Sequence, residues 1–214
     1  MGTTGLEAQE SPQPAEYDSL VSLFYEWREF ESPPLLNGAP NYTKNSFQKR
    51  QVKFKELRSR LNKIDVSGWD KKYAIDFKIV WAEMNGYDFN RRVLKPWERD
   101  PAFYQTVWTY ESDVPAHEGP TNHAVLELWT YSFPLTTKEE KRLVKELGVI
   151  APLLKQARKN LTGNAKDLWV AGITNFEKQK RVLEALQNDI VDKTDELSSA
   201  LKKQRKRPFF LFFG

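Results

Sequence analysis

The sequence of 214 residues contains no cysteine. Without thiols the chain cannot form a disulfide framework, a thiolate zinc site, an iron–sulfur cluster or a cysteine nucleophile. Histidine is almost as scarce, because His117 and His123 are the two that the sequence has, and every imidazole-based site would need one or both. No apolar run approaches the roughly 20 residues that a membrane-spanning helix requires. We therefore expect no membrane span.

Motifs that cradle phosphates or activate serine are missing as well. The sequence has no Gly-x-Gly-x-x-Gly, no Walker-type loop and no Gly-x-Ser-x-Gly elbow. Its 33 basic and 29 acidic side chains leave a net charge of +4, which is too even for a phosphate-binding field over the whole surface. We expect no nucleic-acid partner. The basic run over residues 202–207 is the feature that would favour nucleic acid or an anionic membrane instead.

Apolar residues with helical spacing cover most of the chain. Residues 16–31 place one such face at Leu20, Leu23, Phe24, Trp27 and Phe30. Similar stripes predict a helix over residues 46–64, capped by Ser46, and an all-round apolar, central helix that starts near 67 or 70 and stops at Pro96. Further helices are predicted over residues 137–148, with a Thr137 capping box, and from Pro152 to 160. For residues 125–133 we favour a helix over a strand.

The last predicted helix is the longest and runs without proline from about residue 164 towards 206. Within it, Phe176, Leu183, Ile190 and Leu197 recur every seven residues and form a seam for another helix, which we expect in the same chain. These patterns predict an all-α fold, a multi-helix array or bundle with a long C-terminal helix and little or no strand.

The composition of the ends suggests a division into three parts. Residues 1–15 form a disordered leader without a visible signal peptide, so the location of the protein stays open. Residues 16–201 form the helical region. Residues 202–214 are a basic and then aromatic tail that we interpret as a truncation or frameshift product, because exposed phenylalanines need a partner surface.

The segment His117-Glu118 resembles the start of a zincin helix, but its spacing does not fit one. Such a helix needs its second histidine four residues on, so that two imidazoles one turn apart converge on zinc. Position 121 is threonine, and His123 lies six residues from His117. We therefore assign no metal ligand and no catalytic residue in this chain.

The best candidate for a binding site is the stretch over residues 84–101, where charged and aromatic residues alternate. Arg91, Arg92 and Arg99 could receive a substrate carboxylate, and Trp97 could stack on the substrate. The alternative is a helix end tied by ion pairs such as Asp88 with Arg92 or Arg99 with Asp100.

This stretch and several later blocks resemble the N-terminal portion of the bacterial domain of unknown function 885 family over residues 16–200. The later blocks are Ser112-Asp113-Val114-Pro115, Glu127-Leu128-Trp129, Phe133-Pro134-Leu135 and Asn160-Leu161-Thr162-Gly163-Asn164-Ala165-Lys166-Asp167-Leu168-Trp169. Members resemble gluzincin-type zinc peptidases, are largely helical and longer, and carry a His-Glu metal motif in their distal half. Because His117-Glu118 precedes the block at residues 160–169, that motif does not transfer to it.

The resemblance implies a helical scaffold that forms one wall of a peptidase cleft, while a catalytic region missing from this sequence supplies the chemistry. Zinc is expected for the full-length proteins and no cofactor for this chain, which would be inactive alone. The implied partners are that catalytic region and a peptide substrate. The alternative is a non-catalytic helical protein-interaction module.

Overall fold

The computed structural model describes residues 12–111, 125–190 and 194–206. The predicted all-α class is confirmed, because helices make up most of this part of the chain and its only strands form two short pairs. The helices are α1 (Tyr17–Glu31), α2 (Lys44–Leu61), α3 (Lys71–Phe89), the π-helix η1 (Asn90–Leu94), α4 (Pro96–Arg99), the 3-10 helices η2 (Pro101–Tyr104) and η3 (Leu128–Thr130), α5 (Thr137–Asn160), α6 (Lys166–Asp189) and α7 (Asp195–Lys206). The strands are β1 (Leu35–Leu36) with antiparallel β2 (Ala39–Pro40), and β3 (Val107–Trp108) with parallel β4 (Leu126–Glu127).

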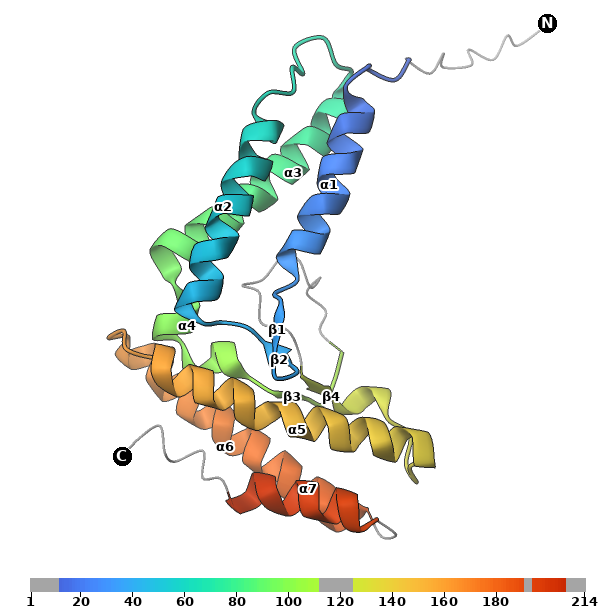
Figure 1. The fold of residues 1–214 in the computed structure, drawn as a ribbon, viewed down its shortest axis with the longest axis vertical. Coiled ribbons are helices and arrows are strands. Elements are labelled where there is room, and N and C mark those ends of the chain that lie inside the picture. The colour runs from blue at the N-terminus through green and yellow to red at the C-terminus, as the bar shows by residue number, and fades with distance from the viewer. Residues whose placement is uncertain (1–11, 112–124, 191–193, 207–214) are drawn as a thin grey trace, which may run out of the picture.

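These elements form two helical groups with separate cores. Helices α1, α2 and α3 make an elongated bundle that stands on a layer of α5, α6 and α7, whose helices run across its lower end (Figure 1). The short elements α4, η2 and the two strand pairs lie between the groups. None of the described helices is long and apolar enough to cross a bilayer.

The core of the α1–α3 bundle follows the predicted stripes. Leu20, Leu23, Trp27 and Phe30 of α1 are buried, and Trp27 has no exposed surface. They pack against Phe54, Leu57 and Leu61 of α2 and Val80 and Met84 of α3. Burying these apolar side chains holds the bundle together, at about 1.5–3 kcal/mol for each large one.

Helix α3 differs from the prediction of a central helix. One of its faces is buried in the bundle, but Ile75, Ile79 and Phe89 are about half exposed. The prediction was wrong because a helix that is apolar on all sides needs neighbours on all sides, and within the described residues the core that α3 joins comes from α1 and α2 on one side of it.

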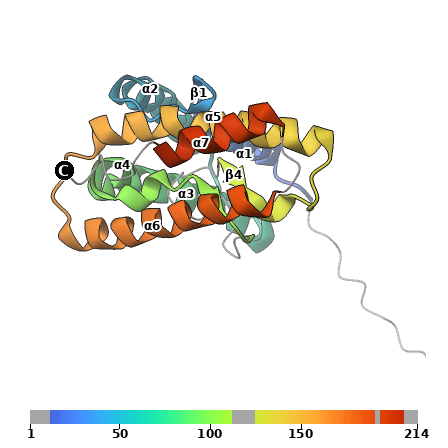
Figure 2. The same ribbon diagram turned by 90° about the horizontal axis from the view of Figure 1, so that it is seen from below.

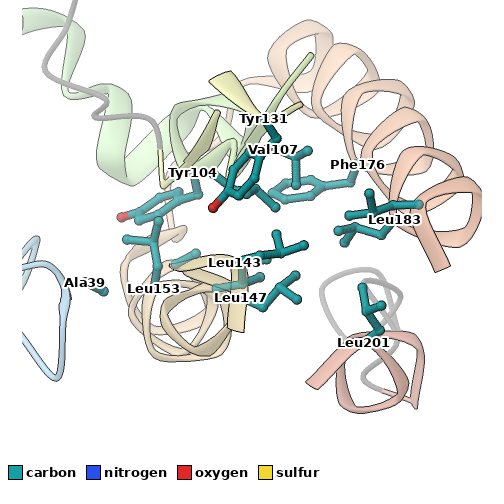
Figure 3. Close-up of a cluster of buried hydrophobic side chains, with 14 of the residues drawn as sticks. Ala39, Tyr104, Val107, Tyr131, Leu143, Leu147, Leu153, Phe176, Leu183 and Leu201 are labelled. Atoms are coloured by element: carbon teal, nitrogen blue, oxygen red, sulfur yellow. The ribbon is translucent and has the colours of Figure 1, made fainter. Parts of the chain in front are cut away.

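The second core lies among α5, α6 and α7. Leu143 and Leu147 of α5, Phe176 and Leu183 of α6 and Leu201 of α7 point toward one another (Figure 3). Phe176, Leu183, Ile190 and Leu197, which define the predicted seven-residue seam, all belong to this core. The seam therefore packs within the chain, as predicted.

The C-terminal helix is not continuous over residues 164–206. Helix α6 ends at Asp189, Ile190 is extended with φ −83° and ψ 106°, and α7 begins at Asp195. Helix α7 lies between α5 and α6 in the view from below (Figure 2). Because the chain breaks between α6 and α7, Leu197 of α7 packs in the same core as Phe176 and Leu183 of α6.

Helix α5 also differs from its predicted bounds. It is one helix from Thr137 to Asn160, although Gly148 was predicted to end a helix and Pro152 to begin the next. Proline inside a helix removes one backbone hydrogen bond, but the buried face on both sides of Pro152 keeps the helix in one piece. The capping box is present one residue earlier than predicted, at Thr136 and Glu139.

Two further local predictions were wrong. Residues 125–133 form β4 and η3 instead of a helix, because the Leu126 amide donates to the Thr106 carbonyl oxygen at 3.0 Å and thereby joins a strand pair. The cap of α2 is Thr43, whose hydroxyl accepts from the Ser46 amide at 3.3 Å.

Candidate functional site

A cavity of about 530 Å³ lies where the two helical groups meet. Its walls come from the end of α1, the segment that leads to α2, the first part of α2, α3, η1, α4 and η2. Clefts between helical units are common places for ligands, and this volume lies within the usual range of about 300–1,000 Å³. This cavity is the candidate site.

One part of the wall is aromatic. Phe47 of α2 stacks on Trp97 of α4, with ring centroids 4.1 Å apart and planes 26° apart. Beside them, Tyr42 and Phe103 have ring centroids 4.7 Å apart. Tyr87 of α3 adds a fifth ring, and burial raises the pKa of its phenol, opposed by the nearby Arg50 guanidinium. The phenol is therefore neutral near pH 7 and able to donate a hydrogen bond.

Two carboxylates also line the cavity, and both bind the same arginine. Arg28 donates to Glu31 and to Glu83, each at 2.7 Å. The Trp27 indole donates to the second oxygen of Glu83 at 3.1 Å. These contacts compensate much of the negative charge of both groups.

Arg50 contributes a positive charge to the cavity wall. Its guanidinium donates to the carbonyl oxygens of Phe30 at 2.6 Å and Ser32 at 2.9 Å, and thus satisfies the C-terminal end of α1. No carboxylate of the described residues forms an ion pair with Arg50. The cavity therefore has a positive charge that is offset mainly by the end of a helix dipole.

The predicted binding residues separate into two groups. Arg91 and Trp97 line the cavity, whereas Arg92 and Arg99 do not. Arg92 is exposed and its Nε donates to Asp88 at 2.7 Å, which is one of the ion pairs proposed as the alternative to binding. The other proposed pair is not formed within the described chain: Arg99 donates weakly to the Leu94 carbonyl oxygen at 3.5 Å.

Arg99 instead helps to fix the loop between α5 and α6. A Cβ atom placed on Gly163 would lie 2.6 Å from the Arg99 Cγ, so the arginine stem rests on a residue without a side chain. The Gly163 amide also donates to the Glu98 carbonyl oxygen at 2.7 Å. Arg99 thus acts in packing, and Asp100 bonds to the Ala102 amide at 2.9 Å.

The position of Arg91 depends on the irregular end of α3. Helix α3 continues into the π-helix η1, and Lys95, with φ 46° and ψ 55°, ends it just before Pro96. Single π turns are rare and are frequent at functional sites. Here the turn places Arg91 on the cavity wall while Arg92 faces solvent with its side chain 58% exposed.

Sequence reasoning missed the wall that residues 31–50 contribute. Arg50 and Phe47 lie on a helix that the sequence indicated only as amphipathic and basic outside. No local pattern joins residues 31–50 to residues 83–103, because their proximity arises from tertiary packing. The sequence signals a turn here through Pro33-Pro34, Asn37-Gly38 and Pro40, but not what the segment packs against.

The described residues contain no group of three His, Asp or Glu side chains able to hold a metal ion. His117 and His123 lie outside the described residues, so the prediction about that segment is not tested.

Comparison with known proteins found no matching family model, no similar curated protein and no similar solved structure. The resemblance to the domain of unknown function 885 family is therefore neither supported nor opposed, and it stays a prediction.

Proposed function

We propose that this chain is a non-catalytic helical unit that binds a peptide ligand in the cavity between its two helical groups. In the setting of the family it resembles, it would form the N-terminal scaffold and one wall of the substrate cleft of a zinc peptidase. The chemistry would come from a catalytic region outside this sequence, which is then its main partner. The observation that carries the proposal is the cavity, with aromatic rings and arginines on its walls.

The lining fits one apolar side chain with its peptide backbone. The Phe47–Trp97 stack and the nearby rings offer an apolar surface, and Arg50, Arg91 and Tyr87 offer hydrogen-bond donors around it. Sites of this kind bind through apolar contact and fix orientation with a few polar groups. The aromatic wall would hold the side chain, and the donors would hold the carbonyl or carboxylate oxygens of the peptide.

Calorimetric titration of the full chain with N-acetyl-Ala-Phe tests the proposal. We expect Trp97→Ala to weaken binding at least tenfold, because it removes half of the Phe47–Trp97 stack. Trp129→Ala is the matched control, since this half-exposed indole does not line the cavity and its loss should leave affinity unchanged. The chain should not cleave the peptide when zinc is added.

Absence of binding by the wild-type chain would refute the proposal, and so would equal losses in the two tryptophan variants. Zinc-dependent cleavage that His117→Ala abolishes would show that the chain carries its own catalytic site. Circular dichroism of each variant would establish that it is folded.

A second candidate function, the helical interaction module, is favoured by a half-exposed apolar stripe of α3 that borders the cavity through Ile79. Ile75, Ile79, Phe89 and Val93 follow helical spacing on one face and are each 48–53% exposed. Exposed apolar stripes of this kind mark interaction sites. The seam of α6 and α7 does not offer such a face, because it is buried within the chain.

In this second reading, two copies of the chain would pair through α3. Light scattering after size-exclusion chromatography would then give a dimer that Ile75→Asp with Phe89→Asp converts to a monomer. Val52→Asp is the control, because Val52 is an exposed apolar residue on α2, away from this face. A wild-type monomer at high protein concentration would exclude self-association through α3.

A further inference from the structure

A cleft of about 870 Å³ lies where the β1–β2 hairpin and the start of α2 meet the last turns of α5. The described residues that line it include four basic side chains and no acidic or aromatic one; the basic ones are Lys44, Lys155, Arg158 and Lys159. All four are exposed and can therefore contact a ligand in the cleft. No residue lines both this cleft and the cavity between the helical groups. The cleft is thus a separate site that the proposed function does not use.

The charges of these four side chains are not neutralised within the described chain. None of the four forms an ion pair or a side-chain hydrogen bond with another described residue. Lys155 precedes Arg158 by three residues and Lys159 by four on α5, a spacing at which like charges repel. An anion bound among them would therefore relieve repulsion as well as add attraction.

Charge is segregated in the two segments that meet at the cleft. Residues 33–55 and 147–166 contain nine basic residues and not one of the 29 acidic residues. The other parts of the chain therefore carry more acidic than basic side chains, although the whole chain is basic. Hydrogen bonds of Gln156 and Asn160 with the backbone of residues 40–42 hold the two segments together. The fold thus gathers a positive charge that the net charge of the whole chain does not reveal.

The kinds of side chain in the lining favour phosphate over other anions. Three of the four cations are lysines, which bind phosphate as point charges, whereas a planar carboxylate is matched best by the paired N–H groups of arginine. The lining has no aromatic ring on which a nucleobase could stack. Helix α2 begins and α5 ends at the cleft, so the opposite partial charges of the two helix ends offset each other. The four side chains therefore set the field.

We infer that this cleft binds a compact ligand that carries several phosphate groups. Such a ligand can engage Lys44 at the start of α2 and the three cations of α5 at the same time. The phosphates supply the recognition, and a base or sugar attached to them adds little. This inference goes beyond the proposed function and does not depend on it.

Calorimetric titration of the full chain with sodium tripolyphosphate tests this inference. We expect tripolyphosphate to bind at least tenfold more tightly than inorganic phosphate, and ATP to bind about as tightly as tripolyphosphate because its base has no ring to stack on. The affinity should fall as salt is raised, since counterions screen exposed charges.

The double variant Lys155→Gln with Lys159→Gln should weaken tripolyphosphate binding at least tenfold. Lys141→Gln with Lys145→Gln is the matched control, because it removes the same charge at the same spacing from exposed positions of the same helix. These positions lie about 21 Å earlier along α5, beyond the screening length of roughly 8 Å at physiological salt. The control should therefore leave the affinity unchanged.

Equal affinity for phosphate and tripolyphosphate in the wild-type chain, or no binding of either, would overturn the inference, and this comparison needs no substitution. Equal losses in the two lysine variants would show that anions are attracted by the overall charge and not by the cleft. Tighter binding of an oligothymidylate than of tripolyphosphate would assign the cleft to nucleic acid instead. Trp97→Ala should leave tripolyphosphate binding unchanged, so failure of this inference is distinguishable from failure of the proposed function.

Discussion

Two helical glycines have opposite roles in this molecule. A Cβ atom on Gly172 of α6 would lie 2.6 Å from the Cβ of Pro101, so α6 and η2 approach more closely than a side chain allows. A Cβ atom on Gly148 of α5 would meet nothing within 4 Å. The first glycine is required by packing, and the second only costs helix propensity.

We therefore expect Gly172→Ala to lower the free energy of unfolding by about 1–3 kcal/mol, the usual cost of overpacking. Gly148→Ala should raise it by about 0.5–1 kcal/mol, because alanine is the better helix former. Urea denaturation followed by circular dichroism measures both. A neutral or stabilising Gly172→Ala would mean that η2 moves away from α6 at no cost.

At the same scale, the sequence could predict part of the candidate site. The spacing of Asp88 and Arg92 by four residues on a helix was enough to predict their ion pair, and alternating charged and aromatic residues drew attention to Arg91 and Trp97. Spacing could not separate Arg91 from Arg92, because both lie in a π turn, which ends at the left-handed Lys95 and does not follow α-helical periodicity. A left-handed lysine has no signal in composition or periodicity.

At the scale of elements, periodicity predicted which faces are buried better than it predicted where helices end. The stripe of α1 and the seam through α6 and α7 were both found in cores. The ends were misjudged where tertiary packing overrode local preference, as at Gly148 and Pro152 inside α5. The break at Ile190 had no such marker, because the seven-residue repeat of Phe176, Leu183, Ile190 and Leu197 continues through it when both helices face one core.

At the scale of the whole molecule, a short segment before α2 fastens one helical group to the other. Ala39 and Tyr42 belong to the core of the α5–α7 group although they precede α2. Gln156 of α5 accepts from the Tyr42 amide at 2.8 Å and donates to the Pro40 carbonyl oxygen at 2.9 Å. One turn on, Asn160 donates to the Tyr42 carbonyl oxygen at 2.6 Å. The side chains of Gln156 and Asn160 thus bond to both N–H and C=O groups of the backbone over residues 40–42.

We expect the double variant Gln156→Leu with Asn160→Leu to uncouple the two helical groups. It leaves the backbone groups of Pro40 and Tyr42 without partners, at about 1–3 kcal/mol each, and removes the Asn160 donor to the Tyr104 hydroxyl, while the apolar side chains of each core are unchanged. Scanning calorimetry should then resolve two unfolding transitions where the wild-type chain gives one. The two cavity walls would also separate, so N-acetyl-Ala-Phe should no longer bind.

The control for this variant is Lys155→Leu with Lys159→Leu, which adds the same side chains at exposed positions of the same turns of α5. A single transition with equal calorimetric and van't Hoff enthalpies in the Gln156 and Asn160 variant would contradict the coupling role. That result would assign the coupling of the groups to ring contacts such as the Phe47–Trp97 stack between α2 and α4 and the Tyr42–Phe103 pair. If Gln156 and Asn160 do couple the groups, the variant that replaces both loses the single unfolding transition and the binding of N-acetyl-Ala-Phe together.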